Sequence, residues 1–533
     1  MTILSPKFLL YGLFVYAALR VFCFVFKRFV ARSPLDNVPG PPSRSFLKGS
    51  LQDIFNFNGW AFHCDLANKY GNAARIQGVL GEKFLYVFDP LAMHNIFLKD
   101  QNAYEPMPSD LQVSSVFFGP GLLGTWAAHM RDMVPLFYGI GRKLEKAFTQ
   151  RVNEGPQEID LTSWSGRTAL ELIAQSALGT SFDPLTEDTV PHPYAVTAKR
   201  LILVLTKTTL FQIYVLPTLL KIRSAKFRRA LELSPFKVLQ EAKEISDLMH
   251  DTSVRIYQSK LKALSEGDDA FKNHIAEGKD LISTLMRNNL NALNGEKLPE
   301  EEIIGQMSTL TFAGTDTTSS AIARTLWLLS QRQDIQDKLR EEVREAMSEQ
   351  NTLSYDQLNG LKYLDSVCRE LLRLYAPVSI IGRIAREETV LPLSSPLTGV
   401  DGRTMKEIIV PKNTTVIVSI FNHNRNPDLW GPDAEEFKPE RWDHLPESLT
   451  NARVPGVYSN LMRFGGGTRA CIGFKFSQLE MKVILSILIS KFKFSLPKDK
   501  VIFWNMTAIT SPCVVGDAGL VPPRLPLIVE KAK

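Results

Sequence analysis

The chain has 533 residues, of which 44% are hydrophobic, and its formal net charge at pH 7 is +6. That length can build one very large core or several domains. The chain is mildly basic but has no long run of Lys or Arg, so it lacks the usual signal of a nucleic-acid-binding protein. The five cysteines are scattered, which excludes a disulfide scaffold and a paired-cysteine zinc site, and indicates a reducing compartment.

The N-terminal segment is predicted to anchor the chain in a membrane. Residues 8–26 are almost entirely apolar, close to the ~20 residues that a helix needs to cross a bilayer. Arg20 interrupts this run near one end, where its side chain can reach the interface. A cleavable signal peptide is the competing interpretation, but the run is long and no small-residue cleavage site follows it. Lys27 and Arg28 outweigh Lys7, so the positive-inside rule places the rest of the chain in the cytosol.

The anchor leads through a stiff linker into the folded part. Residues 39–42 read PGPP, which is typical of an extended spacer. We therefore expect a membrane anchor at 1–28, a Pro-rich linker at 29–45 and one folded domain at 46–533. Within that domain, residues 73–88 show two alternating stretches around glycines, which predicts a β-hairpin.

A second apolar stretch at 201–222 resembles another membrane span. Lys207 and Pro217 interrupt it, so we favour two helices that dip into the membrane interface or line a pocket.

The longest predicted helix begins at Pro299 and continues past Trp327, with three glutamates in its first turn. Its middle, residues 313–318 (AGTDTT), is a cluster of poor helix formers. Such a cluster can mark a local widening of the helix that admits a ligand. It can equally be a patch of hydroxyls bonded back to their own helix. The adjacent acid and alcohol, Asp316 and Thr317, could relay a proton to something bound beside the helix.

A further helix at 361–375 carries a possible ion pair. Glu370 and Arg373 are spaced i, i+3 beside an apolar face. Such a pair is usually a weak surface contact. Another arginine follows at Arg441, within the sequence PERW of residues 439–442, and a buried glutamate with two arginines would rigidify the region.

The most informative stretch is residues 464–473, FGGGTRACIG. A lone cysteine, Cys471, follows three glycines that allow a sharp turn and close approach to a ligand. The apolar run 474–489 predicts a helix directly after it, and a helix N-terminus favours thiolate over thiol. The pattern leaves open whether the sulfur is a nucleophile or a metal ligand.

The order of these motifs resembles the cytochrome P450 superfamily, in its membrane-anchored eukaryotic and fungal form. The resemblance rests on AGTDTT, the Glu370–Arg373 spacing, PERW and the cysteine stretch, in that order. It implies a mainly α-helical fold with small β-sheets, the cytochrome P450 fold, preceded by the N-terminal transmembrane helix.

The resemblance also implies a haem b cofactor. Its iron would be held axially by Cys471, as in the thiolate-ligated haem proteins. Phe464 would shield the thiolate, and Arg469 and Arg383 would each contact a haem propionate. By the same resemblance, Gly467 and Gly473 of the stretch 464–473 also belong to the cofactor site.

Two other motifs take different roles by the same resemblance. Asp316 and Thr317 would be the catalytic pair that delivers protons to bound dioxygen. Glu370, Arg373 and Arg441 would form a structural triad without a catalytic role.

The implied reaction inserts one oxygen atom into an unactivated C–H or C=C bond of a lipophilic small molecule. Electrons would come from NADPH through NADPH–cytochrome P450 reductase, with cytochrome b5 as a further candidate partner. We expect a single-pass protein of the endoplasmic reticulum membrane that serves secondary metabolism. By family position, its substrate pocket would be lined near 309–313, 378–381 and 504–510, which are mostly apolar.

One part of the family pattern does not fit. Members carry a helix, called the C-helix, in which a Trp or His and an Arg meet a propionate. Aligned through Trp126, this chain has Met130 at the arginine position. The sequence of residues 129–138 is more similar to the segment that follows the C-helix in the family. We therefore favour a deletion of the C-helix itself, just after residues 124–125. The alternative function is therefore a haem-binding but inactive or truncated family member that lacks the C-helix.

Overall fold

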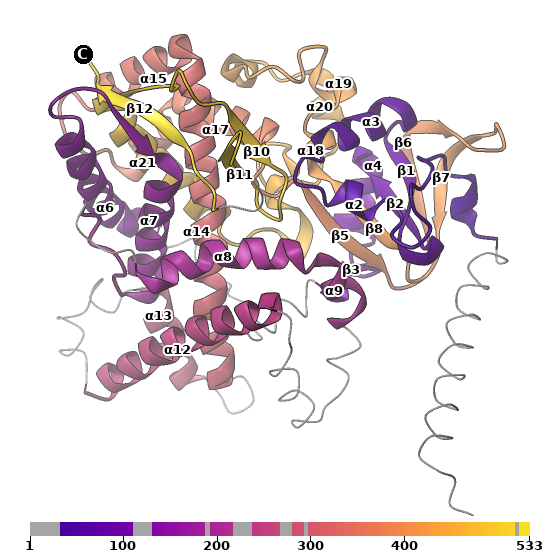
Figure 1. Ribbon diagram of the computed structural model, residues 1–533, viewed down its shortest axis with the longest axis horizontal. Coiled ribbons are helices and arrows are strands. Elements are labelled where there is room, and N and C mark those ends of the chain that lie inside the picture. Colours follow the sequence, from indigo (N-terminus) through magenta and orange to yellow (C-terminus); the bar gives the residue numbers. More distant parts are fainter. Residues whose placement is uncertain are drawn as a thin grey trace, which may run out of the picture. The chain divides into compact units, whose positions relative to one another are not determined.

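The computed structural model describes residues 32–109, 130–186, 192–216, 237–266, 280–292, 297–517 and 522–533. The anchor predicted at 1–28 lies outside these residues. No helix within the described ranges is long and apolar enough to cross a membrane. The described chain is mainly helical with small sheets (Figure 1), as the sequence predicted. Its contacts group into two units, which are described separately.

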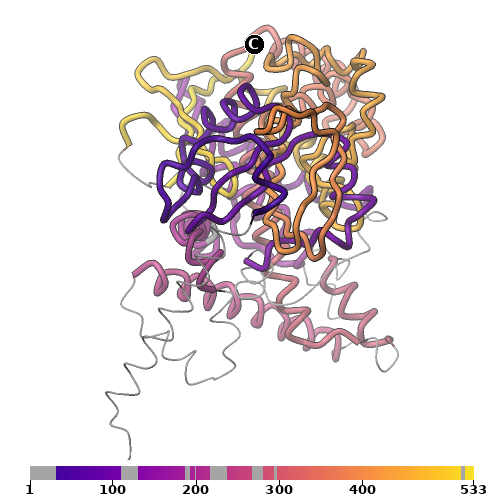
Figure 2. The backbone as a smooth tube through the Cα atoms, turned by 90° about the vertical axis from the view of Figure 1, so that its right-hand side faces the viewer, coloured from indigo at the N-terminus to yellow at the C-terminus, as the bar shows by residue number. Residues whose placement is uncertain are grey.

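The first unit contains most of the β-structure, from residues up to 107, 380–423 and 452–455. Its largest sheet has five strands in the order β1-β2-β8-β5-β3. Figure 2 shows the early strands (indigo) beside the later ones (orange), although they are far apart in the sequence. The strands of the unit are β1 (Ala73–Gln77), β2 (Lys83–Val87), β3 (Tyr104–Pro106), β5 (Ile380–Ala385), β6 (Thr389–Thr398), β7 (Thr404–Val410) and β8 (Thr415–Ser419). Its helical elements are η1 (Pro34–Asn37), α2 (Leu51–Ile54), α3 (Trp60–Tyr70), η2 (Val79–Gly81), α4 (Pro90–His94), η3 (Asn95–Lys99) and α18 (Ile420–His423).

The hairpin predicted at 73–88 is confirmed. Strands β1 and β2 pair antiparallel, with Ala73 opposite Val87 and Gln77 opposite Lys83. β2 is buried almost throughout because β8 pairs with its other edge in parallel. Strands β6 and β7 form a separate two-stranded sheet.

The second unit holds the long helices and the elements around Cys471. Its long helices are α6 (Met130–Arg151), α7 (Leu161–Ile173), α8 (Pro193–Lys207), α12 (Lys237–Glu266), α13 (Leu281–Asn291), α14 (Glu300–Gln331), α15 (Gln333–Ala346), α17 (Lys362–Leu374) and α21 (Phe474–Lys491). The shorter ones are η5 (Ala174–Leu178), α9 (Thr209–Tyr214), α16 (Tyr355–Gly360), α19 (Pro427–Trp430), η8 (Pro439–Asp443), α20 (Glu447–Asn451), η9 (Met462–Phe464) and η10 (Gly467–Arg469). Strands β4 (Gln157–Asp160), β9 (Phe492–Ser495) and β12 (Pro526–Lys531) form one small sheet, and β10 (Ile502–Asn505) and β11 (Ser511–Val514) form another.

Helix α14 is the central element of this unit. It begins after Pro299 with acidic residues in its first turn, as predicted. It packs against α7, α12 and α21, and its side chains are buried around almost its whole circumference. A helix that is buried on all sides is a core helix. Helix α14 is therefore a fixed support for any group that lies beside its few exposed residues.

Helix α8 accounts for part of the apolar stretch at 201–222. It ends at Lys207, and the short helix α9 follows after Thr208. The sequence prediction of two helices is confirmed up to residue 216, and Pro217 lies outside the described residues.

Candidate functional site

The turn before Cys471 is shaped by glycines in left-handed conformations. Gly465 and Gly467 have φ angles of +67° and +68°, a region that strongly favours glycine. The turn brings the backbone N–H of Cys471 to the carbonyl oxygen of Phe464 at 2.7 Å. Gly473 then precedes the first residue of α21. The loop thus presents a free, accessible thiol at the N-terminal end of a largely buried helix.

The protonation of Cys471 differs from the sequence prediction. Solvent can reach the residue, but surrounding protein raises the pKa of the thiol by desolvation, and the backbone contact with Gly473 only partly opposes this. Without a bound metal ion, the surroundings of Cys471 therefore favour the thiol. A bound metal ion would instead favour the thiolate, because a thiol that coordinates a metal is deprotonated.

The surroundings of Cys471 leave room for a large cofactor. A Cβ atom added to Gly473 would meet no atom within 4 Å, and Arg469 is exposed. The ring of Phe464 packs with Tyr458 and Phe474 at centroid distances of 5.7 and 6.2 Å.

Helix α14 runs without interruption through residues 313–318, so of the two interpretations of this cluster the local widening is not the one observed. The hydroxyls bond back to their own helix instead. Thr317 donates to the carbonyl oxygen of Ala313 at 2.7 Å, and Thr315 donates to that of Thr311 at 2.6 Å. These bonds satisfy the hydroxyls within the α-helical geometry, so no carbonyl needs to leave the helix.

The same helix nevertheless has one accessible strip. Thr309, Ala313 and Thr317, each four residues from the next, are exposed or half-buried, whereas most of α14 is buried. Asp316 is almost fully buried and lines a cavity of about 40 Å³ together with Ile509. A ligand beside α14 would therefore meet a threonine hydroxyl, with a carboxylate one residue away.

Helices α14 and α21, which carry these two sets of residues, pack against each other. At their contact lies Glu480 of α21, a fully buried carboxyl that we did not predict. Burial raises its pKa well above the ordinary value, against a smaller lowering by the hydroxyl of Thr318. Burial thus favours the protonated form of this carboxyl. Cys471, just before α21, and the pair Asp316 and Thr317 on α14 are thus attached to two helices that pack together.

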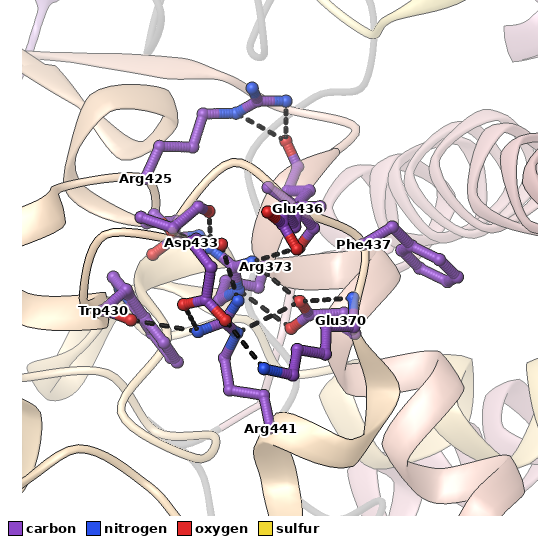
Figure 3. Close-up of polar contacts among 12 residues, drawn as sticks. Glu370, Arg373, Arg425, Trp430, Asp433, Glu436, Phe437 and Arg441 are labelled. Atoms are coloured by element: carbon purple, nitrogen blue, oxygen red, sulfur yellow. Dashed lines mark hydrogen bonds and ion pairs between the residues drawn. The ribbon is translucent and has the colours of Figure 1, made fainter.

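The triad of Glu370, Arg373 and Arg441 is confirmed as a buried cluster (Figure 3). Arg373 binds both carboxylate oxygens of Glu370, at 2.7 and 2.8 Å, and neither side chain is exposed. Arg441 approaches the same carboxylate at 3.3 Å. The backbone N–H of Lys438 and the indole N–H of Trp442 each donate to it at 3.1 Å. A buried carboxylate with this many donors locks α17 to the segment that contains η8.

Asp433 completes the cluster on the outer side of Arg441 and was missing from the sequence prediction. Its carboxylate accepts from Nη1 of Arg441 at 2.6 Å and from Nζ of Lys438 at 3.0 Å. The hydrogen bond from Arg441 is the main reason that the pKa of Asp433 is lowered to about 2. No spacing in the sequence relates Asp433 to Glu370, so only the fold could reveal this contact.

We predict that Asp433→Asn destabilises the protein in a pH-dependent way. Because the pKa of Asp433 is lowered in the folded state, its stabilising effect is complete above the unfolded value of about 3.9 and disappears as the pH falls towards about 2. The difference in urea midpoint between wild type and D433N should be constant above about pH 5 and shrink below about pH 4. A difference that stays constant down to pH 3 would contradict this assignment.

Arg383 lies on β5 of the first unit, apart from the residues above. Its guanidinium lies over the ring of Phe97 at 5.0 Å and donates to the carbonyl oxygen of Gly382 at 2.9 Å. Its expected contact with a propionate stays a prediction.

The segment in which we predicted a missing helix lies mostly at 110–129, outside the described residues. Helix α6 begins at Met130, which is buried. Arg131 is exposed and pairs with Asp356 at 2.9 Å. The favoured deletion therefore stays a prediction.

Comparison with known proteins identifies the family. The family model described as Cytochrome P450 matches residues 39–512. Cytochrome P450 monooxygenase 91 of Postia placenta is 47% identical over 96% of each chain, and cytochrome P450 monooxygenase 219 of the same fungus is 41% identical over 98% of this chain and 99% of its own. A ganoderic acid synthetase of Ganoderma lucidum is 43% identical over 93% of this chain and 94% of its own. The chain belongs to the cytochrome P450 family.

Membership of this family makes the chain an enzyme, a cytochrome P450 monooxygenase. It also implies a haem cofactor, a redox partner and a lipophilic substrate. The described residues fit a haem: it needs one axial ligand from the protein, and the accessible Cys471 beside the open space at Gly473 can provide it.

Proposed function

We propose that the protein inserts one oxygen atom of O2 into an unactivated C–H or C=C bond of a lipophilic small molecule, and that the second atom leaves as water. The observation that carries this proposal is the accessible thiol of Cys471, presented by a glycine turn at the start of α21. Haem b, when bound, supplies the redox chemistry that activates O2. Cys471 would be its axial ligand, and Arg469 would bind a propionate.

Proton delivery is assigned to α14. The hydroxyl of Thr317 donates to Ala313, so its lone pairs remain able to accept a proton or a water. The carboxyl group of Asp316, one residue away, lines the neighbouring cavity. The pair can hold and pass protons towards the accessible strip of α14 while the packed helices exclude bulk water.

The substrate region lies beside the same helix. The described lining of the cavity has no lysine and no carboxylate other than Asp316. Besides five hydroxyl-bearing residues, it contains the apolar residues Ile202, Leu203, Ala323, Ile509, Pro512 and Pro523. Ser320 of α14 donates to the carbonyl oxygen of Thr510 at 2.7 Å and so fixes the segment between β10 and β11. These features support an apolar substrate. One relative is named for ganoderic acid synthesis, which supports a role in secondary metabolism.

We further propose that residues 1–28 anchor the protein in the endoplasmic reticulum membrane and that the catalytic domain, 46–533, faces the cytosol. Electrons would come from NADPH through the membrane reductase, with cytochrome b5 as a second donor. Lys475, exposed near Cys471 at the start of α21, supports docking of an acidic partner on this face.

Carbon monoxide spectroscopy of the reduced protein in membranes tests the proposal. The thiolate-type Soret band is expected, followed by NADPH-dependent product formation when reductase is added. A protein that binds haem and shows the band but never turns over would favour the inactive alternative. Absence of the band would refute the monooxygenase mechanism.

We predict that Thr317→Ala uncouples the reaction. Without the hydroxyl, α14 would pass protons less effectively, so more O2 should be released as hydrogen peroxide and less product should form per NADPH. The measurement is the ratio of product to NADPH consumed, with peroxide assayed in parallel. Thr317→Ser should restore coupling.

Thr325→Ala is the matched control, since Thr325 makes the same kind of bond to Ala321 at 2.8 Å two turns further along α14. Equal uncoupling in both alanine variants would show that the effect comes from loosening the helix.

A further inference from the structure

Arg324 of α14 is a buried arginine that lies among three aromatic rings. It is only 8% exposed. Its guanidinium carbon lies 3.9 Å from the ring centroid of Tyr375, 4.1 Å from that of Trp504 and 4.7 Å from that of Trp327. Burial lowers the pKa of Arg324, and the contact with Tyr375 only partly opposes this. Cation–π attraction is strongest for a desolvated cation, so these rings hold the guanidinium firmly.

The three rings come from three different parts of the second unit. Trp327 lies on α14 itself, Tyr375 directly follows α17, and Trp504 lies on β10. The rings of Trp327 and Trp504 also contact each other, with their centroids 5.9 Å apart. Arg324 therefore connects α14 to the end of α17 and to β10.

The loop between β10 and β11 forms part of the wall of the cavity beside α14. Ile509 and Thr510 of this loop line the cavity together with Asp316. The loop begins just after β10, the strand that carries Trp504. Arg324 thus holds the strand from which this part of the cavity wall extends.

The far end of the same loop is held by the same elements. The carbonyl oxygen of Thr510 accepts from the hydroxyl of Ser320, one turn before Arg324 on α14, at 2.7 Å. The backbone N–H of Thr510 donates to the carbonyl oxygen of Pro377, two residues after Tyr375, at 2.8 Å. Both ends of the loop are therefore fixed to α14 and to the segment after α17.

We propose that Arg324 is a specificity-determining positioning residue, which holds the loop between β10 and β11 beside the substrate cavity through Trp504 and Tyr375. The inference rests on the proposed function, which places the substrate beside α14. Arg324 is not among the described residues that line the cavity, so it acts through the wall rather than by touching the substrate. A wall that is ordered in advance loses less conformational freedom when a ligand binds. Loosening it should therefore weaken binding of the apolar part of a ligand.

The test measures binding of imidazole and N-octylimidazole to the full-length holoprotein in detergent. Both probes bind the haem iron through a ring nitrogen and shift the Soret band, but only N-octylimidazole extends an apolar chain into the substrate cavity. Wild type should therefore bind N-octylimidazole more tightly than imidazole. In Arg324→Met, the Kd of N-octylimidazole should rise about 3- to 30-fold, the range for loss of a cation–π contact, whereas the Kd of imidazole should change less than about 2-fold.

Further variants separate the cation–π contact from a loss of volume. Arg324→Lys keeps the charge but not the planar guanidinium, so its Kd for N-octylimidazole should lie between those of wild type and R324M. Trp504→Leu removes one of the three rings and should reproduce the selective weakening. Trp504→Phe keeps a ring face and should lie closer to wild type. The variants at Trp504 decide the question if R324M does not fold.

Arg340→Met is the matched control. Arg340 is a buried arginine of the same unit, 7% exposed, but it binds the carbonyl oxygens of Ile489 and Phe492 and is not among the described residues that line the cavity. Its replacement should lower the urea midpoint without changing the ratio of the two Kd values. An equal change of this ratio in R340M would overturn the proposal, because general loosening of the fold would then explain the effect.

The remaining outcomes separate this proposal from the proposed function. If wild type binds imidazole at the haem iron but R324M and W504L keep the wild-type ratio of Kd values, only the role of Arg324 is refuted. The same holds if wild type binds N-octylimidazole no more tightly than imidazole. If wild type takes up no haem, both proposals are refuted.

Discussion

Replacing Cys471 by alanine is expected to abolish oxygenation and the thiolate-type Soret band. The loop offers its sulfur as an accessible ligand at the start of α21, and alanine leaves the iron without an axial ligand from the protein. Cys471→His should retain haem in part, because imidazole is also a haem ligand, but without the thiolate spectrum or activity. The measurements are haem content, the carbon monoxide difference spectrum of the reduced protein, and product formation.

The control for this prediction is Cys64→Ala. Cys64 is a half-buried cysteine on α3 in the first unit, and its replacement should leave the spectrum and the activity unchanged. A thiolate-type band in Cys471→Ala would contradict the assignment of the ligand.

The second large effect is expected from Glu370→Ala. This substitution leaves Arg373 without its buried counter-charge and removes a contact of Arg441. Removing one partner of a buried ion pair typically costs about 3–5 kcal/mol of unfolding free energy. We therefore expect a lower urea midpoint for the full chain in detergent, and poor recovery of folded holoprotein. Glu370→Gln should be less damaging, since it keeps the volume and one acceptor oxygen.

The matched control is Glu440→Gln, one residue before Arg441. Glu440 is 44% exposed and pairs with Lys338 at 2.8 Å, so its loss should change the unfolding free energy by less than about 1 kcal/mol. Similar urea midpoints for E370A and E440Q would show that burial of the triad does not stabilise the fold.

Several features could be predicted because they depend on neighbours in the sequence. The helix after Pro299, the hairpin at 73–88 and the helix after Cys471 all follow from local periodicity, glycines and caps, and all are present. The Glu370–Arg373 pair follows from helical spacing. That Arg441 joins this pair was predicted from the order of the motifs along the chain, and the structure confirms its contact with Glu370.

Other features were missed or mistaken because they depend on what surrounds a group in space. The sequence of residues 313–318 left open whether the helix widens there, and in the structure the hydroxyls of Thr315 and Thr317 bond within an unbroken helix. The thiol of Cys471 has a raised pKa because desolvation by the surrounding protein outweighs the backbone contact with Gly473. Neither effect can be read from composition, since both depend on which atoms exclude water.

The amino-acid sequence was sufficient to recognise the family and to single out Cys471, Asp316 and Thr317, because their chemistry is encoded in short stretches whose neighbours along the chain matter most. Packing between distant segments determined the rest. Asp433 became a partner of Arg441, and the carboxyl of Glu480 became buried, which raises its pKa. Burial is the common physical reason, since the energy of a charge depends on its solvent and partners in three dimensions.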